Sequence, residues 1–247
     1  MKKYSTSKTF ASILSRREMF GFVGGTAAFL LVGNWRKQAV SLTQAIATPS
    51  CVAKPEQTEG PYFVDEKLNR FDIRSDPSDG SVERGVPLQL VFQVSQLGNS
   101  SCTPLKNATV DVWHCNAKGI YSDASDRSFN TVGKKFLRGY QVTDEQGVAK
   151  FITIYPGWYP GRAVHIHFKI STNSKSQPSY EFTSQLYFND SLSDRIYTQS
   201  IYSKPGQRLL NKRDKIFQNG GKQLTLQLTP AAEGYIGKFA IGLELPS

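Results

Sequence analysis

The chain of 247 residues contains three histidines, and two of them, His165 and His167, stand two positions apart in "YPGWYPGRAVHIHFKI" (155–170). The β-branched and aromatic residues around them are typical of a strand. Side chains two positions apart on a strand project from the same face, about 6.6 Å apart along the chain. Two imidazoles arranged in this way can bind one metal ion.

Two tyrosines are the remaining candidate ligands. Tyr159 lies in the turn "PGWYPGR" before the histidine pair, and Tyr121 ends the segment "VDVWHCNAKGIYSD". A phenolate is a hard anionic donor that suits Fe(III) better than zinc, and a trivalent ion deprotonates a phenol whose ordinary pKa is about 10. The zinc motifs H-E-x-x-H and C-x-x-C are absent from the sequence. Two tyrosinates, two neutral imidazoles and one hydroxide would give a neutral Fe(III) site.

The third histidine, His114, precedes Cys115 in another predicted strand, and no pattern pairs it with the other two. We expect it in the core or behind the ligands rather than on the metal.

The elements that must position these residues are short strands. Period-two alternation, β-branched and aromatic residues and intervening turn signals predict strands at 87–95, 108–115, 136–143, 148–155, 163–170, 180–188 and 222–229. Residues 193–202 are consistent with one short helix. No strand–helix alternation and no repeat is present, so the sequence predicts an all-β fold, an antiparallel β-sandwich with long loops and a short helix. We assign residues 61–247 to this domain and residues 48–60 to an arm that leads into it.

Four segments together resemble the intradiol ring-cleavage dioxygenases. They are "CVAKPEQTEGPYF", "CTPLKNATVDVWHCNAKGIYSD", "FLRGYQVTDEQGVAKFITIYPGWYPGRAVHIHFKI" and "TSQLYF", and the resemblance extends from about residue 51 to residue 245. The combination of W-x(7)-Y with P-G-x-Y-P-x-R-x-x-H-I-H is highly specific.

The resemblance implies a ligand set and a reaction. It places non-haem Fe(III) on Tyr121, Tyr159, His165 and His167, with Tyr159 leaving the iron when substrate binds. Arg162 and Gln185 match the family's active-site arginine and a pocket glutamine, so that Arg162, Tyr159 and Gln185 are the expected catalytic residues. The implied substrates are O₂ and a catechol-type aromatic, which is cleaved between its two hydroxylated carbons to a cis,cis-muconate-type diacid. Tyr62 is either a pocket residue or a packed aromatic.

One residue bears on the choice of substrate. Gly161 stands where protocatechuate enzymes of the family tend to carry a bulky aromatic, which indicates a more open pocket. Catechol, hydroxyquinol, protocatechuate and plant phenols all remain candidate substrates. The alternatives to the enzyme are an exported β-sandwich module that binds metal or aromatics without turnover, and a zinc or copper protein built on the H-x-H pair.

The N-terminal residues 1–47 read as a twin-arginine-like signal peptide. Arg16 and Arg17 precede an apolar, glycine-containing run from Met19 to Gly33, and "AIA" (45–47) offers a cleavage site. We therefore expect the export machinery as a partner and a periplasmic or extracellular location. An uncleaved membrane anchor is the alternative.

The charge of +10 is concentrated in this N-terminal segment, which holds seven Lys/Arg and one Glu. The remaining 23 basic and 19 acidic residues form no basic run interleaved with aromatics, so nucleic acid is not an expected partner. In an oxidising compartment two of Cys51, Cys102 and Cys115 could pair, and the sequence does not say which two. The oligomeric state also stays open, a homo-oligomer included.

Overall fold

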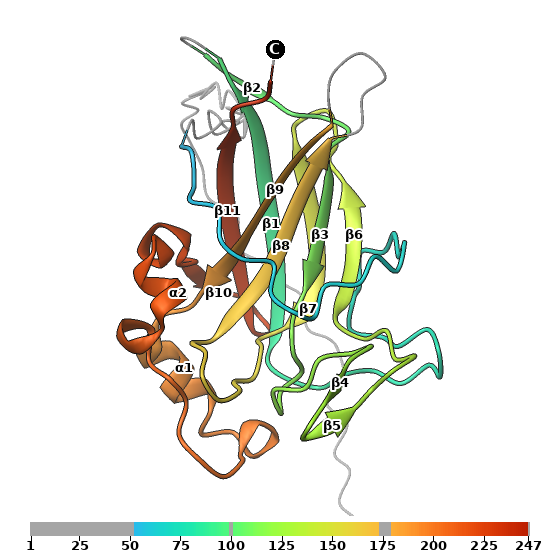
Figure 1. The fold of residues 1–247 in the computed structure, drawn as a ribbon, viewed down its shortest axis with the longest axis vertical. Helices are drawn as coiled ribbons and strands as arrows, with labels where there is room; N and C mark the ends of the chain where they lie inside the picture. The colour runs from blue at the N-terminus through green and yellow to red at the C-terminus, as the bar shows by residue number, and fades with distance from the viewer. Residues whose placement is uncertain (1–51, 99–100, 173–178, 247) are drawn as a thin grey trace, which may run out of the picture. The chain divides into compact units, whose positions relative to one another are not determined.

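The computed structural model describes residues 52–98, 101–172 and 179–246, which form two β-sheets packed face to face (Figure 1). The predicted signal peptide (residues 1–47) lies outside the described residues. So do residues 48–51, the start of the predicted arm. None of the helices in the described part is long and apolar enough to cross a membrane.

The first sheet is organised around β1 (Pro87–Leu97), in which buried and half-buried residues alternate. On one side β1 pairs with β11 (Tyr235–Leu243), which in turn pairs with β10 (Leu228–Pro230). On its other side β1 pairs with β7 (Val148–Ile154) and with β2 (Cys102–Pro104).

The second sheet carries the histidine pair. Its order is β6 (Arg138–Val142), β3 (Thr109–Trp113), β8 (His165–Thr172) and β9 (Tyr180–Tyr187), with every pair antiparallel. A small hairpin of β4 (Ser125–Asp126) and β5 (Phe129–Asn130) lies in the loop between β3 and β6. The register places Trp113, His167 and Gln185 in one row across β3, β8 and β9, so their side chains share a face of the sheet.

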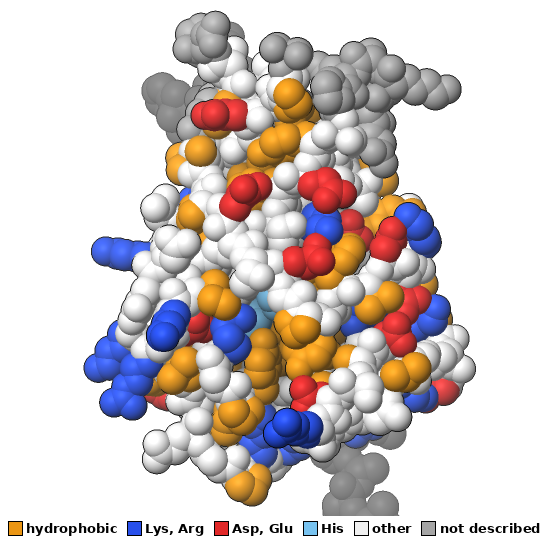
Figure 2. Space-filling model, in the orientation of Figure 1, with side chains coloured by type: hydrophobic (Ala, Val, Ile, Leu, Met, Phe, Trp, Pro, Cys, Tyr) orange, Lys and Arg blue, Asp and Glu red, His pale blue; other side chains and the backbone are white. Residues whose placement is uncertain are grey.

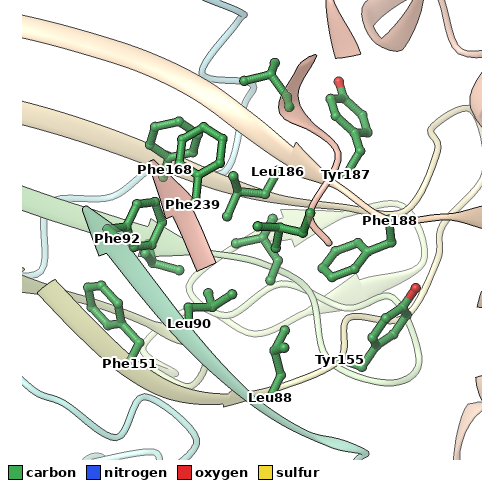
Figure 3. Packing of buried hydrophobic residues seen from close by; sticks show 14 of the residues in the cluster. Leu88, Leu90, Phe92, Phe151, Tyr155, Phe168, Leu186, Tyr187, Phe188 and Phe239 are labelled. Atoms are coloured by element: carbon green, nitrogen blue, oxygen red, sulfur yellow. The ribbon is translucent and has the colours of Figure 1, made fainter. Parts of the chain in front are cut away.

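The core between the sheets is rich in aromatic residues. The ring of Phe92 on β1 lies 6.0 Å from Phe151, 6.0 Å from Phe239 and 5.4 Å from Phe168 of the opposite sheet (Figure 3). On β8 the alternation sends Ile166, Phe168 and Ile170 into this core. His165 and His167 therefore project from the other face of the sheet.

Residues 57–70, which precede β1 in the chain, cover that outer face. They cross the second sheet in front of β8 and β3 in Figure 1, and their backbone is tied to β9 by Gln57 N–H donating to Thr183 O at 2.9 Å. Farther along, Arg70 N–H donates to Tyr140 O on β6 at 3.1 Å. This cover explains why both faces of β8 are buried.

The connection from β9 to β10 holds the helices. They are α1 (Asp190–Ile196), α2 (Lys215–Gln218) and three 3₁₀ helices at Ser200–Tyr202, Asn211–Arg213 and Gly221–Leu224. Asn189 is the N-cap of α1. Its side chain accepts a hydrogen bond from Ser191 N–H, as expected at this position.

The all-β sandwich predicted from the sequence is confirmed, with several differences in detail. The β1–β11 pair is parallel, so the first sheet is not wholly antiparallel. The predicted strand 222–229 is wrong for residues 222–227, because Gly220 at φ 86° ends α2 and starts the 3₁₀ helix Gly221–Leu224, and β10 begins only at Leu228. The predicted helix 193–202 is α1 followed by the 3₁₀ helix Ser200–Tyr202. The long strand β11 and the short strands β2, β4 and β5 were not predicted from the sequence.

Candidate metal centre

The four predicted ligands meet at one point of the structure. His165 Nε2 lies 3.0 Å from His167 Nε2, 3.2 Å from the Tyr159 hydroxyl and 3.5 Å from the Tyr121 hydroxyl. Metal–ligand bonds of about 2.0–2.2 Å place donors that share one ion roughly 3 to 3.5 Å apart. Within the described ranges no group of three or more His, Cys, Asp or Glu side chains could hold a metal. A metal site at this cluster therefore needs the two phenols as ligands.

The histidine pair is held in the neutral form that a metal requires. His165 Nδ1 lies 2.6 Å from Ala163 O, and because a carbonyl only accepts, Nδ1 carries the proton and Nε2 presents its lone pair to the cluster. Burial, and then the charge of Arg162, lower the pKa of His165 to about 3. Burial and the neighbouring His165 also hold the pKa of His167 well below its ordinary value.

His167 is fixed by packing rather than by a hydrogen bond to its outer nitrogen. Its ring stacks on Trp113 at 5.0 Å with an interplanar angle of 7°. Gly60, which lies within residues 57–70, is so close to the His167 ring that an added Cβ would be 3.2 Å from His167 Cε1. Nδ1 of His167 is buried without a partner among the described residues, so no hydrogen bond at that nitrogen orients the ring.

Tyr121 is delivered by the loop that follows β3. The Asn116 side chain accepts hydrogen bonds from Lys118 N–H and Ile120 N–H, which turns the chain, and Thr131 Oγ1 donates to Tyr121 O at 2.6 Å. The Tyr121 side chain is 1% exposed. The ring of Tyr62 covers it in a stacked arrangement with 4.4 Å between centroids, so Tyr62 is packed against a candidate ligand.

Tyr159 comes from the loop between β7 and β8. This loop packs backbone to backbone on the Tyr121 loop at Gly157, whose N–H donates to Asn116 O at 3.1 Å. An added Cβ at Gly157 would meet Ala117 O and Asn116 O at 2.5 Å, so only glycine permits this approach. Tyr159 is half-buried, whereas Tyr121 is fully buried.

The donor chemistry fits a trivalent ion. Burial raises the pKa values of both Tyr159 and Tyr121, so neither phenol ionises by itself at neutral pH. A cation bound among the four donors would reverse this shift, because the phenolates would then neutralise its charge. The residues present therefore suit Fe(III), with Tyr121, Tyr159, His165 and His167 as its holders.

Arg162 lies at the edge of the cluster. Its Nη1 is 3.5 Å from His165 Nε2, its Nη2 donates to Gln185 Oε1 at 2.5 Å, and its Nε donates to Asp214 Oδ2 at 3.0 Å. The guanidinium is therefore held from two sides with one nitrogen directed at the ligands.

Gln185 occupies a different place from the one expected of a pocket residue. It is fully buried, accepts from Arg162 and donates through Nε2 to Thr58 O at 2.8 Å. Because it pairs with His167 across β8 and β9, its side chain lies behind Arg162 rather than in the wall of the cleft.

The cleft beside the cluster has a volume of about 530 Å³. Tyr121 and Tyr159 form its inner wall, and the other lining residues are Tyr62, Lys118, Gly119, Ile120, Asp126, Ser128, Phe129, Pro160 and Lys204. The Tyr62 hydroxyl donates to Asp126 Oδ2 at 3.0 Å. On the face shown in Figure 2, a small area of histidine atoms is visible with hydrophobic side chains below it.

His114 and the cysteines do not belong to the cluster. His114 is buried, with Nε2 2.6 Å from Thr153 Oγ1 and Nδ1 2.9 Å from Cys115 O, as expected of a core histidine. Cys102 and Cys115 are free thiols in the described part of the chain, and Cys51 lies outside it.

Three residues around the site were not predicted from the sequence as site residues. Tyr187 faces the same side as His165 and Gln185, which the period of two within "TSQLYF" could have indicated. The side chains of Gln57 and Asp214 reach the site from distant segments. In the sequence, Gln57 is recognisable only as a residue of the predicted arm and Asp214 only as a helix N-cap. Nothing local indicates that either of them contacts the site.

Comparisons with known proteins point to one family. The family model described as Dioxygenase matches residues 58–229. The protocatechuate 3,4-dioxygenase beta chain of Burkholderia cepacia is 30% identical over 167 residues, 64% of this chain and 62% of that protein. A catechol 1,2-dioxygenase of Candida albicans is 29% identical over 116 residues, 38% of this chain and 37% of that protein. The chain thus spans less than two thirds of the length of these relatives.

Solved structures extend the match over most of the fold. An intradiol ring-cleavage dioxygenase from Tetranychus urticae aligns with a TM-score of 0.65 and 30% identity, covering 79% of this chain and 94% of that one. The dioxygenase domain of a carbohydrate-binding fusion from Streptomyces sp. SirexAA-E aligns with a TM-score of 0.54 and 28% identity, covering 79% and 100%. The family model, these relatives and these structures place the chain among the dioxygenases, a class of oxidoreductases. Within that class, the chain belongs to the intradiol ring-cleavage dioxygenase family.

Proposed function

We propose that this protein is a non-haem Fe(III) enzyme that cleaves a catechol-type aromatic ring between its two hydroxylated carbons. Both atoms of O₂ would enter the product, a cis,cis-muconate-type diacid. The observation that carries the proposal is a cluster of two phenols and two neutral imidazoles at the inner wall of a cleft, in which the hydroxyls of Tyr121 and Tyr159 and Nε2 of His167 lie 3.0–3.5 Å from His165 Nε2.

Bound Fe(III) supplies the centre that takes up both catechol oxygens and makes the ring reactive toward O₂. The protein's own residues then divide the remaining tasks. Tyr159 is half-buried and lines the cleft, so its side chain has open space on that side and can accept a catechol proton. Tyr121 is enclosed under Tyr62 and stays in place.

Arg162 stabilises negative charge. Its guanidinium is permanently protonated, and its Nη1 faces the cluster at which the anionic substrate would bind. A fixed cation in a water-poor site stabilises charge that develops on the ring during the reaction. Gln185 acts on this guanidinium by holding Nη2 rather than by touching substrate.

The cleft favours a catechol that carries a ring substituent. A volume of about 530 Å³ falls within the roughly 300–1,000 Å³ typical of sites for drug-sized ligands, well above the need of a single ring. Its outer wall combines apolar Ile120 and Phe129 with polar Ser128 and Asp126. This mixture suits a substituent with both apolar and hydrogen-bonding parts.

The test is turnover of the iron-loaded full chain under ¹⁸O₂. We expect catechol-dependent oxygen uptake, two labelled atoms in a muconate-type diacid, and a higher kcat/KM for catechols with a bulky 4-substituent than for catechol. A protein that binds catechols without oxygen uptake would instead be a binding module, and activity with Zn²⁺ but not with iron would indicate the H-x-H alternative. Either result would refute the proposal.

We also propose export by the twin-arginine route, supported by Arg16 and Arg17 before the apolar run from Met19 to Gly33. The test is fractionation of cells expressing the full chain. Replacing both arginines with lysine should retain the protein in the cytoplasm, and unchanged export of that variant would refute this route.

A further inference from the structure

Asp214 is a buried carboxylate next to the cluster, 52 residues after Arg162 in the chain. It is 2% exposed, and its Oδ2 accepts two hydrogen bonds, from Arg162 Nε at 3.0 Å and from Ala163 N–H at 2.7 Å. One oxygen atom therefore holds both the side chain of Arg162 and the peptide that follows it.

The other oxygen of Asp214 is anchored in the helical segment. Oδ1 accepts from Ile216 N–H at 2.7 Å and from Phe217 N–H at 3.3 Å, so Asp214 is the N-cap of α2. Burial alone would raise the pKa of this carboxyl. The N–H of Ala163 and the charge of Arg162 more than offset that effect and hold the pKa below its ordinary value. The group is therefore a fixed anion with four donors.

The two residues that Asp214 holds both lead to the metal ligands. Arg162 directs Nη1 to within 3.5 Å of His165 Nε2 while Gln185 holds its Nη2. Ala163 provides the carbonyl that lies 2.6 Å from His165 Nδ1 and sets the tautomer of that ring. Movement of the Asp214 carboxylate would disturb the aim of the guanidinium first, because the Ala163 peptide is also held by its place in the chain before β8.

We propose that Asp214 is a positioning residue that aims the Arg162 guanidinium at the substrate bound on the metal. The inference rests on the proposed function for its effect on turnover, but the contact between the two side chains does not depend on it. A helix cap alone would require only Oδ1, whereas Oδ2 is committed to Arg162 and Ala163.

The test variant is Asp214→Asn, which keeps a cap for α2 but removes the charge that holds Arg162. Asp190→Asn is the matched control, since Asp190 also pairs with a buried arginine, Arg208 Nη1 at 2.5 Å, and accepts from Asn211 N–H, outside the cluster. Because Arg162 would act on charge that develops in the transition state, we expect Asp214→Asn to lower kcat and kcat/KM together, by about 10- to 100-fold. Iron content and the visible spectrum should stay those of the parent.

A double-mutant cycle separates positioning from structural damage. In an Arg162→Gln background, Asp214→Asn should lower kcat by less than about threefold, because the residue through which it acts is gone. Full additivity would overturn the proposal. If Asp214→Asn does not fold, Asp214→Ser serves in its place, because serine caps α2 but is too short to reach Arg162 Nε.

A second readout does not depend on activity. In the iron-free full chain, the Arg162 Nε–H signal, assigned by its loss in Arg162→Gln, should exchange with solvent at least about tenfold faster in Asp214→Asn than in the parent or in Asp190→Asn. An unchanged exchange rate would refute the clamp. If the parent enzyme has no ring-cleaving activity, the proposed function fails, while this exchange rate still decides the role of Asp214.

Discussion

Gly60→Ala tests whether residues 57–70, which cover the outer face of the second sheet, shape the metal centre. Gly60 has φ 75°, a conformation that costs a residue with a Cβ about 1–2 kcal/mol. The added methyl group would also lie 3.2 Å from His167 Cε1, so the imidazole must shift by a few tenths of an ångström. His167 has little freedom to do so, because its other face stacks on Trp113 at 5.0 Å.

Gly80→Ala is the matched control. Gly80 has the same φ of 75°, and an added Cβ there meets nothing within 4 Å. Both variants should therefore lose about 1–2 kcal/mol from the backbone, which lowers Tm by roughly 2–8 °C in a domain of this size. Any further difference between them reports the contact with His167.

The assay is the visible spectrum and the iron affinity of both variants. We expect Gly80→Ala to match the parent in both, whereas Gly60→Ala should bind iron at least about tenfold more weakly, an effect worth about 1.4 kcal/mol, and show a shifted absorption band. Identical spectra and iron affinities in the two alanine variants would refute the claim that Gly60 holds His167 in place.

Two further predictions follow from the site and from the sheet behind it. Tyr159→Phe should retain iron but slow catechol binding by about 10²-fold or more, since the proton acceptor at the cleft is lost, and stopped-flow absorbance measures this. Tyr155→Phe, in the same loop but hydrogen-bonded to Ser193, should bind catechol normally, and equal rates in the two variants would count against the role of Tyr159. Burial and then Asp65 raise the pKa of Asp111 to about 6, so the stability that depends on its protonated form is full below pH 4 and is lost as the pH rises through 6. Asp111→Asn should thus raise the free energy of unfolding by about 1–3 kcal/mol at pH 8 and by less at pH 5, which urea titrations at the two pH values would measure. A gain that is the same at both pH values would contradict the raised pKa of Asp111.

Much of the fold was predictable because its strands carry local signals. In β1 and β8 the alternation of apolar residues sets which face meets the core, and that parity also places His165 and His167 together on the opposite face. β11 was missed because Gly237 and Gly242 interrupt its apolar pattern. Its parallel pairing with β1 depends on contacts between the two ends of the domain, which no local pattern encodes.

The members of the candidate ligand cluster were predictable from residue types, spacing and the family resemblance, but the contacts that support them were not. Trp113 stacks on His167 because β3 and β8 pair in one particular register, and Asp214 reaches Arg162 across 52 residues. Such contacts are fixed by tertiary packing. The position of Gln185 behind Arg162 follows from the same cause, since the β8–β9 register sets its neighbours.

The most direct test of the account is the visible spectrum of the purified, iron-loaded chain, recorded with the iron content of the parent and of His165→Ala. Two tyrosinates on Fe(III) should give the parent a burgundy colour from ligand-to-metal charge transfer, and anaerobic catechol should shift that band. His165→Ala should lose the metal and the colour. A colourless parent with a full complement of iron, or equal iron content in the parent and in His165→Ala, would contradict the assignment of the four ligands.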